Sequence, residues 1–104
     1  AINKNYIFST SMPSPNPSEG IIIVPFNKVF ERNMNTYGDS YIVNMLGERL
    51  CNGTIAIDSD IEINDKRHQS GSISFECQQL PSGVYMIIIS SGDYVSTYSV
   101  VISK

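Results

Sequence analysis

Apolar and polar residues alternate with a period of two along much of this chain, and short groups of turn residues interrupt the alternation. In residues 72–77, isoleucine, phenylalanine and cysteine alternate with two serines and a glutamate. Residues 84–89 are apolar at every position, which predicts a central strand or a strand whose outer face is covered. The pattern predicts short β-strands at residues 21–26, 29–31, 41–46, 48–51, 54–57, 61–63, 72–77, 84–90 and 94–102.

Glycine or asparagine occurs at each predicted reversal, at residues 35–39, 46–47, 51–53, 65–71, 81–83 and 90–93. These two residue types tolerate the positive φ that tight turns require. The nearest helical candidate, residues 27–34, is short and has no clear apolar stripe. Strands this short cannot bury a face as one flat sheet. The chain is therefore predicted to be all-β, an immunoglobulin-like antiparallel β-sandwich of about seven strands.

Length and charge exclude several classes of partner. The chain has 104 residues, 41% of them hydrophobic, which fits one domain with one modest core. Its net charge is −3 and its seven basic residues are scattered, so no nucleic-acid or anionic-lipid partner is expected. The longest apolar runs are far below the roughly 20 residues that span a bilayer, so no membrane insertion is expected. The chain starts at Ala1 without a methionine or a leader, which suggests an excised part of a longer protein.

Two motifs rich in proline and glycine frame the predicted domain. Leu80-Pro81-Ser82-Gly83-Val84-Tyr85 opens a hairpin that carries the chain to Lys104. Pro15-Asn16-Pro17-Ser18-Glu19-Gly20 holds the chain extended and releases it into the first predicted strand. Residues 1–14 are mixed and polar, which is typical of a linker or of a loosely attached edge segment.

These motifs occur in an order that resembles the C-terminal sorting domain of the type IX secretion system of Bacteroidetes, also called the Por secretion tail. Residues 15–20, the first motif along the chain, are similar to the family's Pro-Asn-Pro-x-x-Gly. Residues 80–85, the second motif, are similar to its Leu-Pro-x-Gly-x-Tyr. Between them, residues 42–50 with Gly47 resemble the family's central strand-Gly-strand hairpin, and residues 96–104 resemble its terminal strand. Each motif alone is ordinary turn chemistry, and the specificity lies in their order.

The resemblance implies a transport signal without catalysis or a cofactor. Family members direct an N-terminal cargo protein from the periplasm through the outer-membrane translocon to the cell surface or beyond. A sortase-like protease then removes the domain. The expected partners are therefore type IX translocon and sortase components and the covalently linked cargo. On this basis residues 1–13 are expected to be a linker that holds the cleavage region, and residues 14–104 the sorting domain.

The recognition residues implied by the family motifs are Pro15, Asn16, Pro17, Gly20, Gly47, Leu80, Pro81, Gly83, Tyr85, Val100, Val101 and Lys104. A mode of recognition that fits a terminal hairpin is strand addition at an exposed sheet edge. On this hypothesis, deletion of residues 100–104 abolishes export. An unpaired terminal strand can also exchange between copies of the domain, so a strand-exchanged dimer is an alternative that the sequence leaves undecided. The rival function is a sugar-binding or adhesive module of a secreted enzyme.

No catalytic site is expected. His68, the one histidine, lies in the charged segment 65–71, and no nucleophile elbow such as Gly-x-Ser-x-Gly accompanies it. A solvated loop histidine is the interpretation that we favour. Two cysteines and one histidine do not make a structural zinc site.

No metal site is expected either, although Asp58, Asp60, Glu62 and Asp65 form an acidic cluster. Alternate spacing places the first three carboxylates on one strand face, where they could bind calcium. The EF-hand pattern fails, because its glycine and glutamate positions hold Ile63 and Gln69. A solvated edge strand, whose like charges discourage aggregation, is the preferred interpretation.

Cys51 and Cys77 leave two alternatives. A disulfide between them suits an exported protein and stabilises by about 3 to 4 kcal/mol in the chain-entropy treatment. Two free thiols are favoured by the alternation, since Leu50 is the expected inward residue of its strand and Cys51 then points away.

Two further patterns have ordinary explanations. Asn52-Gly53-Thr54 fits a glycosylation sequon, but Asn-Gly is first a hairpin signal. The six tyrosines would support sugar binding if they formed one aromatic platform, although pairing across strands is the simpler expectation.

Overall fold

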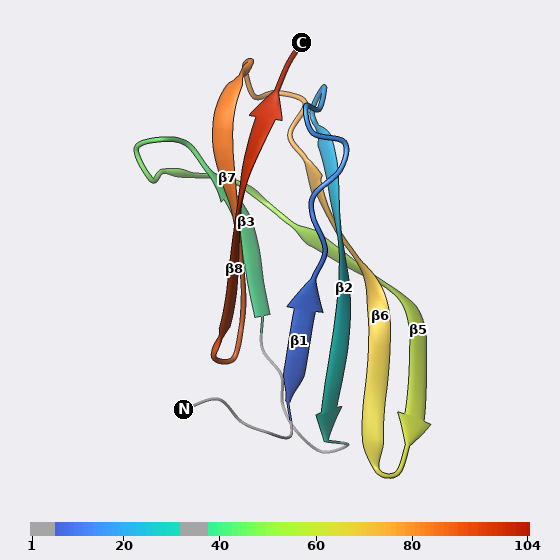
Figure 1. Ribbon diagram of the computed structural model, residues 1–104. Coiled ribbons are helices and arrows are strands. Elements are labelled where there is room, and N and C mark those ends of the chain that lie inside the picture. Colours follow the sequence, from blue (N-terminus) through green and yellow to red (C-terminus); the bar gives the residue numbers. More distant parts are fainter. Residues whose placement is uncertain (1–5, 32–37) are drawn as a thin grey trace.

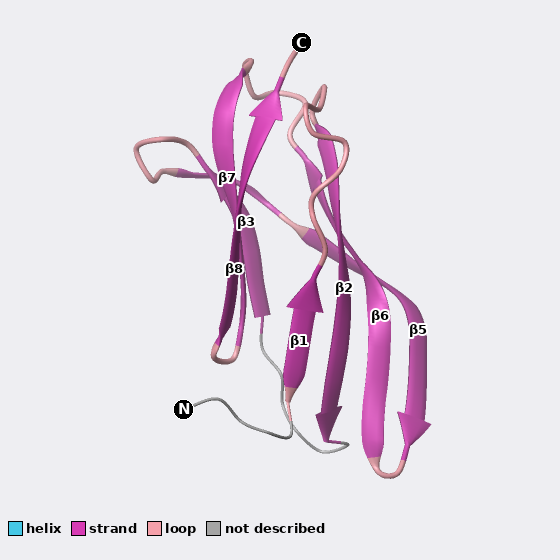
Figure 2. Ribbon diagram, viewed as in Figure 1, coloured by secondary structure: helices cyan, strands magenta, loops and turns pink. Residues whose placement is uncertain are grey.

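The computed structural model describes residues 6–31 and 38–104, and these form eight strands in two four-stranded antiparallel sheets (Figures 1 and 2). The strands are β1 (Ile7–Thr10), β2 (Ile21–Glu31), β3 (Gly38–Val43), β4 (Arg49–Asn52), β5 (Thr54–Ile63), β6 (Lys66–Glu76), β7 (Gly83–Ser91) and β8 (Tyr94–Ile102). No helix occurs within these described ranges.

The two sheets have the strand order of an immunoglobulin sandwich. Sheet A has the order β1-β2-β6-β5, and sheet B has the order β4-β3-β7-β8. Strands β1, β2, β6 and β5 correspond in order to strands A, B, E and D of an immunoglobulin domain. Strands β3, β7 and β8 correspond to C, F and G of the opposite sheet, and β4 is an added strand beside β3. The predicted fold class is confirmed, with eight strands in place of about seven.

The core lies between the sheets and follows the predicted alternation. In β2, Ile22, Val24 and Phe26 point inward and are at most 4% exposed, while Ile21 and Ile23 are 44% and 41% exposed. Each fully buried side chain of this size contributes about 1.5 to 3 kcal/mol. The buried core consists of Ile22, Val24, Phe26, Ile42, Ile73, Phe75, Cys77, Leu80, Tyr85, Ile87, Ile89, Val100 and Ile102. Strands β2, β6, β7 and β8 supply most of it.

The predicted turn at residues 65–71 is wrong, because the reversal occupies only Asn64 and Asp65. Both residues have positive φ, 52° and 65°, which is the conformation of a two-residue hairpin turn. Strand β6 then begins at Lys66 and runs to Glu76 without interruption. His68 is consequently a half-buried strand residue, opposite Val29 and Ile61, and not a loop residue.

Strand β5 joins two segments that were predicted as separate strands. Its register against β6 shifts between Ile57 and Ser59, so a bulge absorbs Asp58 and the strand continues to Ile63. Gly71 lies opposite Ile57, where an added Cβ would collide with the carbonyl oxygen of Ala56. Glycine at this position is therefore required by close backbone approach beside the bulge.

The N-terminal segment is partly structured. Of the two interpretations of residues 1–14, the edge segment applies to Ile7–Thr10, which pairs as β1 with β2. Residues 1–5 of the expected linker lie outside the described residues. The same holds for residues 32–37, which include parts of the helical candidate and of the turn at 35–39. A domain boundary at Ser14 stays a prediction.

Candidate recognition site

The first motif crosses from one sheet to the other. Ser14 forms two backbone hydrogen bonds with Ile23 of β2, of 3.0 and 2.8 Å, and so belongs to sheet A. Four residues later, the N–H of Ser18 donates to the carbonyl of Val101 at 2.9 Å, and the N–H of Ser103 donates to the carbonyl of Ser18 at 2.7 Å. Residues 14–18, here called the crossing segment, therefore join the edges of the two sheets.

Asn16 completes the contact with the last strand through its side chain. The backbone N–H of Val101 donates to Oδ1 of Asn16 at 2.9 Å, and Nδ2 of Asn16 donates to the carbonyl of Ser99 at 3.3 Å. The side-chain amide thus acts as one more peptide group along the edge of β8. From Ser99 to Ser103, this edge is covered by the crossing segment.

Asn16→Ala is expected to lower the free energy of unfolding by about 1 to 2 kcal/mol, because two partly exposed hydrogen bonds are lost. Asn16→Asp is the matched control, since it keeps the acceptor for Val101 and loses the donor for Ser99. The free energy of unfolding of Asn16→Asp should lie between that of the wild type and that of the alanine variant. Denaturant titration measures all three. An alanine variant as stable as the wild type would show that the amide does not hold the edge.

Cys77 connects the two motifs. Its N–H donates to the carbonyl of Gly20 at 2.6 Å, and its carbonyl accepts from the N–H of Leu80 at 3.0 Å. Gly20 has φ +135°, and an added Cβ would lie 2.8 Å from the Cα of Gln78. The glycine of the first motif is therefore required both by backbone conformation and by close approach.

The second motif forms a tyrosine corner. The hydroxyl of Tyr85, at the start of β7, donates to the carbonyl of Pro81 four residues earlier at 2.7 Å. In immunoglobulin-like domains a tyrosine at the same corner bonds back to the backbone in this way. Leu80 and Tyr85 are both buried in the core, at 8% and 6% exposure. The Leu-Pro-x-Gly-x-Tyr pattern thus fixes the loop that leads from sheet A to sheet B.

Lys104 binds to this same loop. Its backbone N–H donates to Oγ of Ser82 at 2.9 Å, and its ammonium group donates to the carbonyl of Gln78. The two motifs, the end of β8 and Lys104 therefore lie together at the upper end of the molecule in Figure 1. Eleven of the twelve predicted recognition residues belong to this cluster, namely Pro15, Asn16, Pro17, Gly20, Leu80, Pro81, Gly83, Tyr85, Val100, Val101 and Lys104.

Gly47 is the exception. It lies in the turn between β3 and β4, which projects from the side of sheet B in Figure 1. Its φ is +83° and its N–H donates to the carbonyl of Asn44 at 3.0 Å. The side chain of Asn44 also accepts from the N–H groups of Leu46 and Glu48. Gly47 therefore belongs to the β3–β4 hairpin and not to the cluster.

Burial divides ten of the eleven clustered residues into two groups, and Gly83 is intermediate. Gly20, Leu80, Tyr85 and Val100 are buried, so their contribution is to the fold of the loops. The exposed members are Pro15, Asn16, Pro17, Pro81, Val101 and Lys104. A shallow hollow beside them is lined by Pro15, Pro17, Ser18, Glu19, Ile21, Ile23 and Gln78. A partner can touch only the second group and this hollow.

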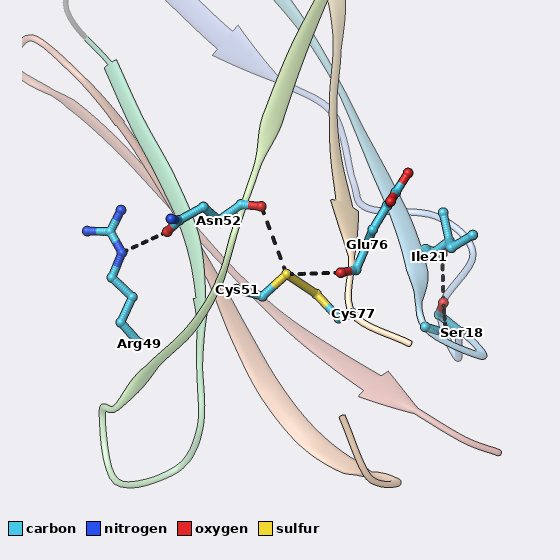
Figure 3. Close-up of a disulfide and its surroundings, with 8 residues drawn as sticks. Ser18, Ile21, Arg49, Cys51, Asn52, Glu76 and Cys77 are labelled. Atoms are coloured by element: carbon cyan, nitrogen blue, oxygen red, sulfur yellow. Dashed lines mark hydrogen bonds between the residues drawn. A yellow bond between two sulfur atoms is a disulfide. The ribbon is translucent and has the colours of Figure 1, made fainter. Parts of the chain in front are cut away.

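The preference for free thiols is wrong, because Cys51 of β4 and Cys77 form a disulfide with a Cα–Cα distance of 6.4 Å (Figure 3). The alternation failed because the register of β4 against β3 shifts next to Cys51. Leu50 and Cys51 both pack partly against the core, and the Cys51 sulfur lies 3.4 Å from the carbonyl oxygen of Glu76. The cross-link ties the edge of sheet B to the end of β6.

The acidic residues of β5 do not form a site. The bulge at Asp58 breaks their alternate spacing, and Asp60 pairs instead with Arg67 and accepts from Gln69 at 3.1 Å. The hydrogen bond from Arg67 lowers the pKa of Asp60. Among residues 6–31 and 38–104, no three His, Cys, Asp or Glu side chains gather closely enough to hold a metal ion.

Tyr6 closes the opposite end of the sandwich. It is 4% exposed, its ring meets Tyr94 edge-on at 5.8 Å, and its carbonyl accepts from the Tyr94 hydroxyl at 3.0 Å. Its own hydroxyl bonds to Oγ of Ser91, and burial raises its pKa. Sequence reasoning considered Tyr6 only as one of six tyrosines expected to pair across strands, and did not expect it to close an end of the sandwich. The only available signal was an aromatic residue just before an alternating segment, and that signal is weak.

The strand order and the joined loops define an immunoglobulin-like β-sandwich domain. Residues 14–103 match the family model described as a secretion system C-terminal sorting domain, and the chain belongs to this family. It is the family of type IX sorting domains, which carry a transport signal and are not catalysts. Searches of curated proteins and of solved structures found no match. No helix of the described residues is long and apolar enough to cross a membrane.

Proposed function

We propose that this domain is the C-terminal sorting signal of a cargo protein that crosses the outer membrane through the type IX translocon. The observation that carries the proposal is the family match over residues 14–103, because its motifs coincide with the loops joined at one end of the fold. The cargo precedes the domain, passes through the periplasm, and reaches the cell surface or the medium. The domain contributes no chemistry of its own. Export of a periplasmic reporter fused before Ala1 tests the proposal.

The exposed members of the cluster are the proposed contacts of the translocon. Pro15, Asn16, Pro17, Pro81, Val101 and Lys104 present an uncharged surface with one ammonium group at its end. Strand addition along residues 100–104 would have to displace the crossing segment, because that segment already binds Val101 and Ser103. We therefore propose that this end is recognised through side chains and loops.

We further propose that a sortase-like protease cuts on the N-terminal side of Tyr6. Proteases favour exposed segments with few backbone hydrogen bonds. Tyr6 is buried, Ile7–Thr10 is paired along its length with β2, and the N–H of Ser11 donates to the carbonyl of Pro25 at 2.9 Å. Cutting within residues 7–14 would require unfolding of this wall of the sandwich.

The position of the cut is measured by mass spectrometry of the domain released from an exported fusion. The expected N-terminus is Tyr6 or an earlier residue. A Tyr6→Ala variant, which loses the contacts that fasten this segment, should give additional cuts between residues 7 and 14. A released wild-type domain that begins after Tyr6 would contradict the proposal.

The rival sugar-binding function receives no support from the described tyrosines. Tyr6 and Tyr94 contact each other inside one end, and Tyr85 forms the corner. The ring of Tyr41 is covered by Arg49 at 4.1 Å, and the hydroxyl of Tyr98 bonds to that of Thr10. They do not form one aromatic platform. Tyr37 lies outside the described residues. Glycan-array binding by the domain, without an effect on export, is the result that would favour this rival.

A further inference from the structure

The four edge strands of the sandwich differ in how well they are protected against pairing with another chain. β1 and β4 have only four residues each, and short edges pair weakly. β5 has ten residues, but it carries a bulge and three carboxylates. β8 has nine residues without a bulge, a proline or a charge, and the part of it before Ser99 is the unprotected edge among the described strands.

The outward backbone groups of β8 can be assigned from the crossing segment. Ser99 and Val101 use their outward groups to bind Asn16 and Ser18. Because residues two apart in a strand direct their backbone groups to the same side, Val95 and Thr97 also direct their N–H and C=O groups away from β7. Within the described part of the chain, no backbone hydrogen bond reaches these groups. Val95 is 66% exposed and Thr97 is also exposed, so the described chain leaves both residues accessible.

We propose that an extended segment of the export machinery adds to β8 along residues 95–98, next to the part covered by the crossing segment, and becomes a fifth strand of sheet B. The proposal rests on the sorting function and names where and how the partner binds. The crossing segment already shows that this edge accepts a chain, since Ser18 pairs in parallel with Ile102. The added strand continues that line of pairing toward the start of β8. An added strand without charged side chains fits best, because β8 has no charged side chain that could pair with one.

A second copy of this domain is a poorer occupant. The four edge residues 95–98 are far fewer than the roughly 20 to 30 residues a side of a stable protein–protein interface. A small contact made of backbone hydrogen bonds suits a partner that must release its cargo after export.

Thr97→Pro tests the proposal, because proline removes the outward N–H and puts its ring in the path of an added strand. Proline is tolerated at edge positions whose N–H faces solvent, so the domain should fold. The surface-exposed fraction of a fused reporter is expected to fall about tenfold, as for the loss of one good hydrogen bond. Export equal to that of the wild type would overturn the proposal.

Ile55→Pro on β5 is the matched control. The N–H of Cys77 faces β2, so Ile73 also faces β2, and its partner Ile55 directs its N–H to solvent. Export of this variant should be unchanged. An equal loss in both variants would mean that any edge proline disturbs export, which contradicts a site on β8.

Three further outcomes are decisive. If Thr97→Pro and Val95→Pro both unfold, the assigned direction of the N–H groups is wrong and the proposal fails. If the wild-type domain is a dimer by sedimentation and Thr97→Pro is a monomer, the occupant is a second copy and the proposed partner is wrong. If the wild-type fusion is not exported, the sorting function itself fails, which is distinct from a failure of the edge.

Discussion

Replacing Cys51 and Cys77 by serine lowers the free energy of unfolding by about 3.5 kcal/mol, the chain-entropy value for a closed loop of this length. The two residues are 26 positions apart, and the loop between them contains β5 and β6. For a domain of this size the loss corresponds to a decrease of about 15 to 25 °C in melting temperature. The effect is large because the cross-link joins the two sheets where the chain passes between them.

Loss of the cross-link should also affect the two motif loops. The backbone of Cys77 is hydrogen-bonded to Gly20 and Leu80, so both loops should loosen before the rest of the domain. Thermal unfolding of the oxidised and reduced wild type, with the double serine variant as control, measures the effect. Reductant should destabilise the wild type and leave the serine variant unchanged. Equal melting temperatures for the oxidised and reduced wild type would contradict the prediction.

Deletion of residues 100–104 is expected to unfold the domain. Val100 and Ile102 are 0% and 1% exposed, and they close the core against β7 and the crossing segment. Loss of two such side chains costs about 5 kcal/mol or more, which approaches the whole stability of a small domain. Circular dichroism of the truncated protein checks this directly. A cooperative transition near that of the wild type would show that these residues are dispensable for folding.

This truncation therefore cannot by itself test recognition by the terminal residues, because export would be lost with the fold. Val101→Asn and deletion of Lys104 alone are better variants. The side chain of Val101 is 37% exposed on the outer face, and Lys104 is exposed and hydrogen-bonds to the loop at residues 78–82. Both variants should fold. Their export then reports on contact with the translocon and not on stability.

The sequence predicts the fold well where local signals agree with tertiary contacts. Residues 94–102 were predicted as a strand and form β8 with the same bounds, because a glycine turn precedes an alternating, uncharged segment. β6 was predicted to begin six residues too late, since Lys66 to Ser70 are polar and resemble a loop. They extend a strand because β2 and β5 pair with them on both sides.

The arrangement of the recognition site could be predicted only in part. The motifs named residues of which eleven lie together in the fold, but nothing local indicates that Asn16 reaches Ser99 and Val101, more than 80 positions away. The disulfide was missed for a similar reason. Its geometry depends on a shift in register between β3 and β4, which sequence alternation does not reveal. Gly47 was grouped with the site through its motif, although it serves a separate hairpin.

The two ends of β8 are fastened by different parts of the chain. The crossing segment binds the end of β8, whereas Tyr6 binds Tyr94 at its start, roughly 27 Å away at the rise of an extended strand. The loop contacts that we propose for the translocon therefore lie far from the cut that we propose before Tyr6.

The most direct test of the sorting function is the surface-exposed fraction of a periplasmic reporter fused before Ala1, measured by protease accessibility in a type IX-competent host. The reporter without the domain, and the fusion in a host with an inactive translocon, are the controls. The account predicts that the fusion reaches the surface in the competent host and that both controls stay in the periplasm. Retention of the fusion in the periplasm of the competent host, with the domain folded, would contradict it.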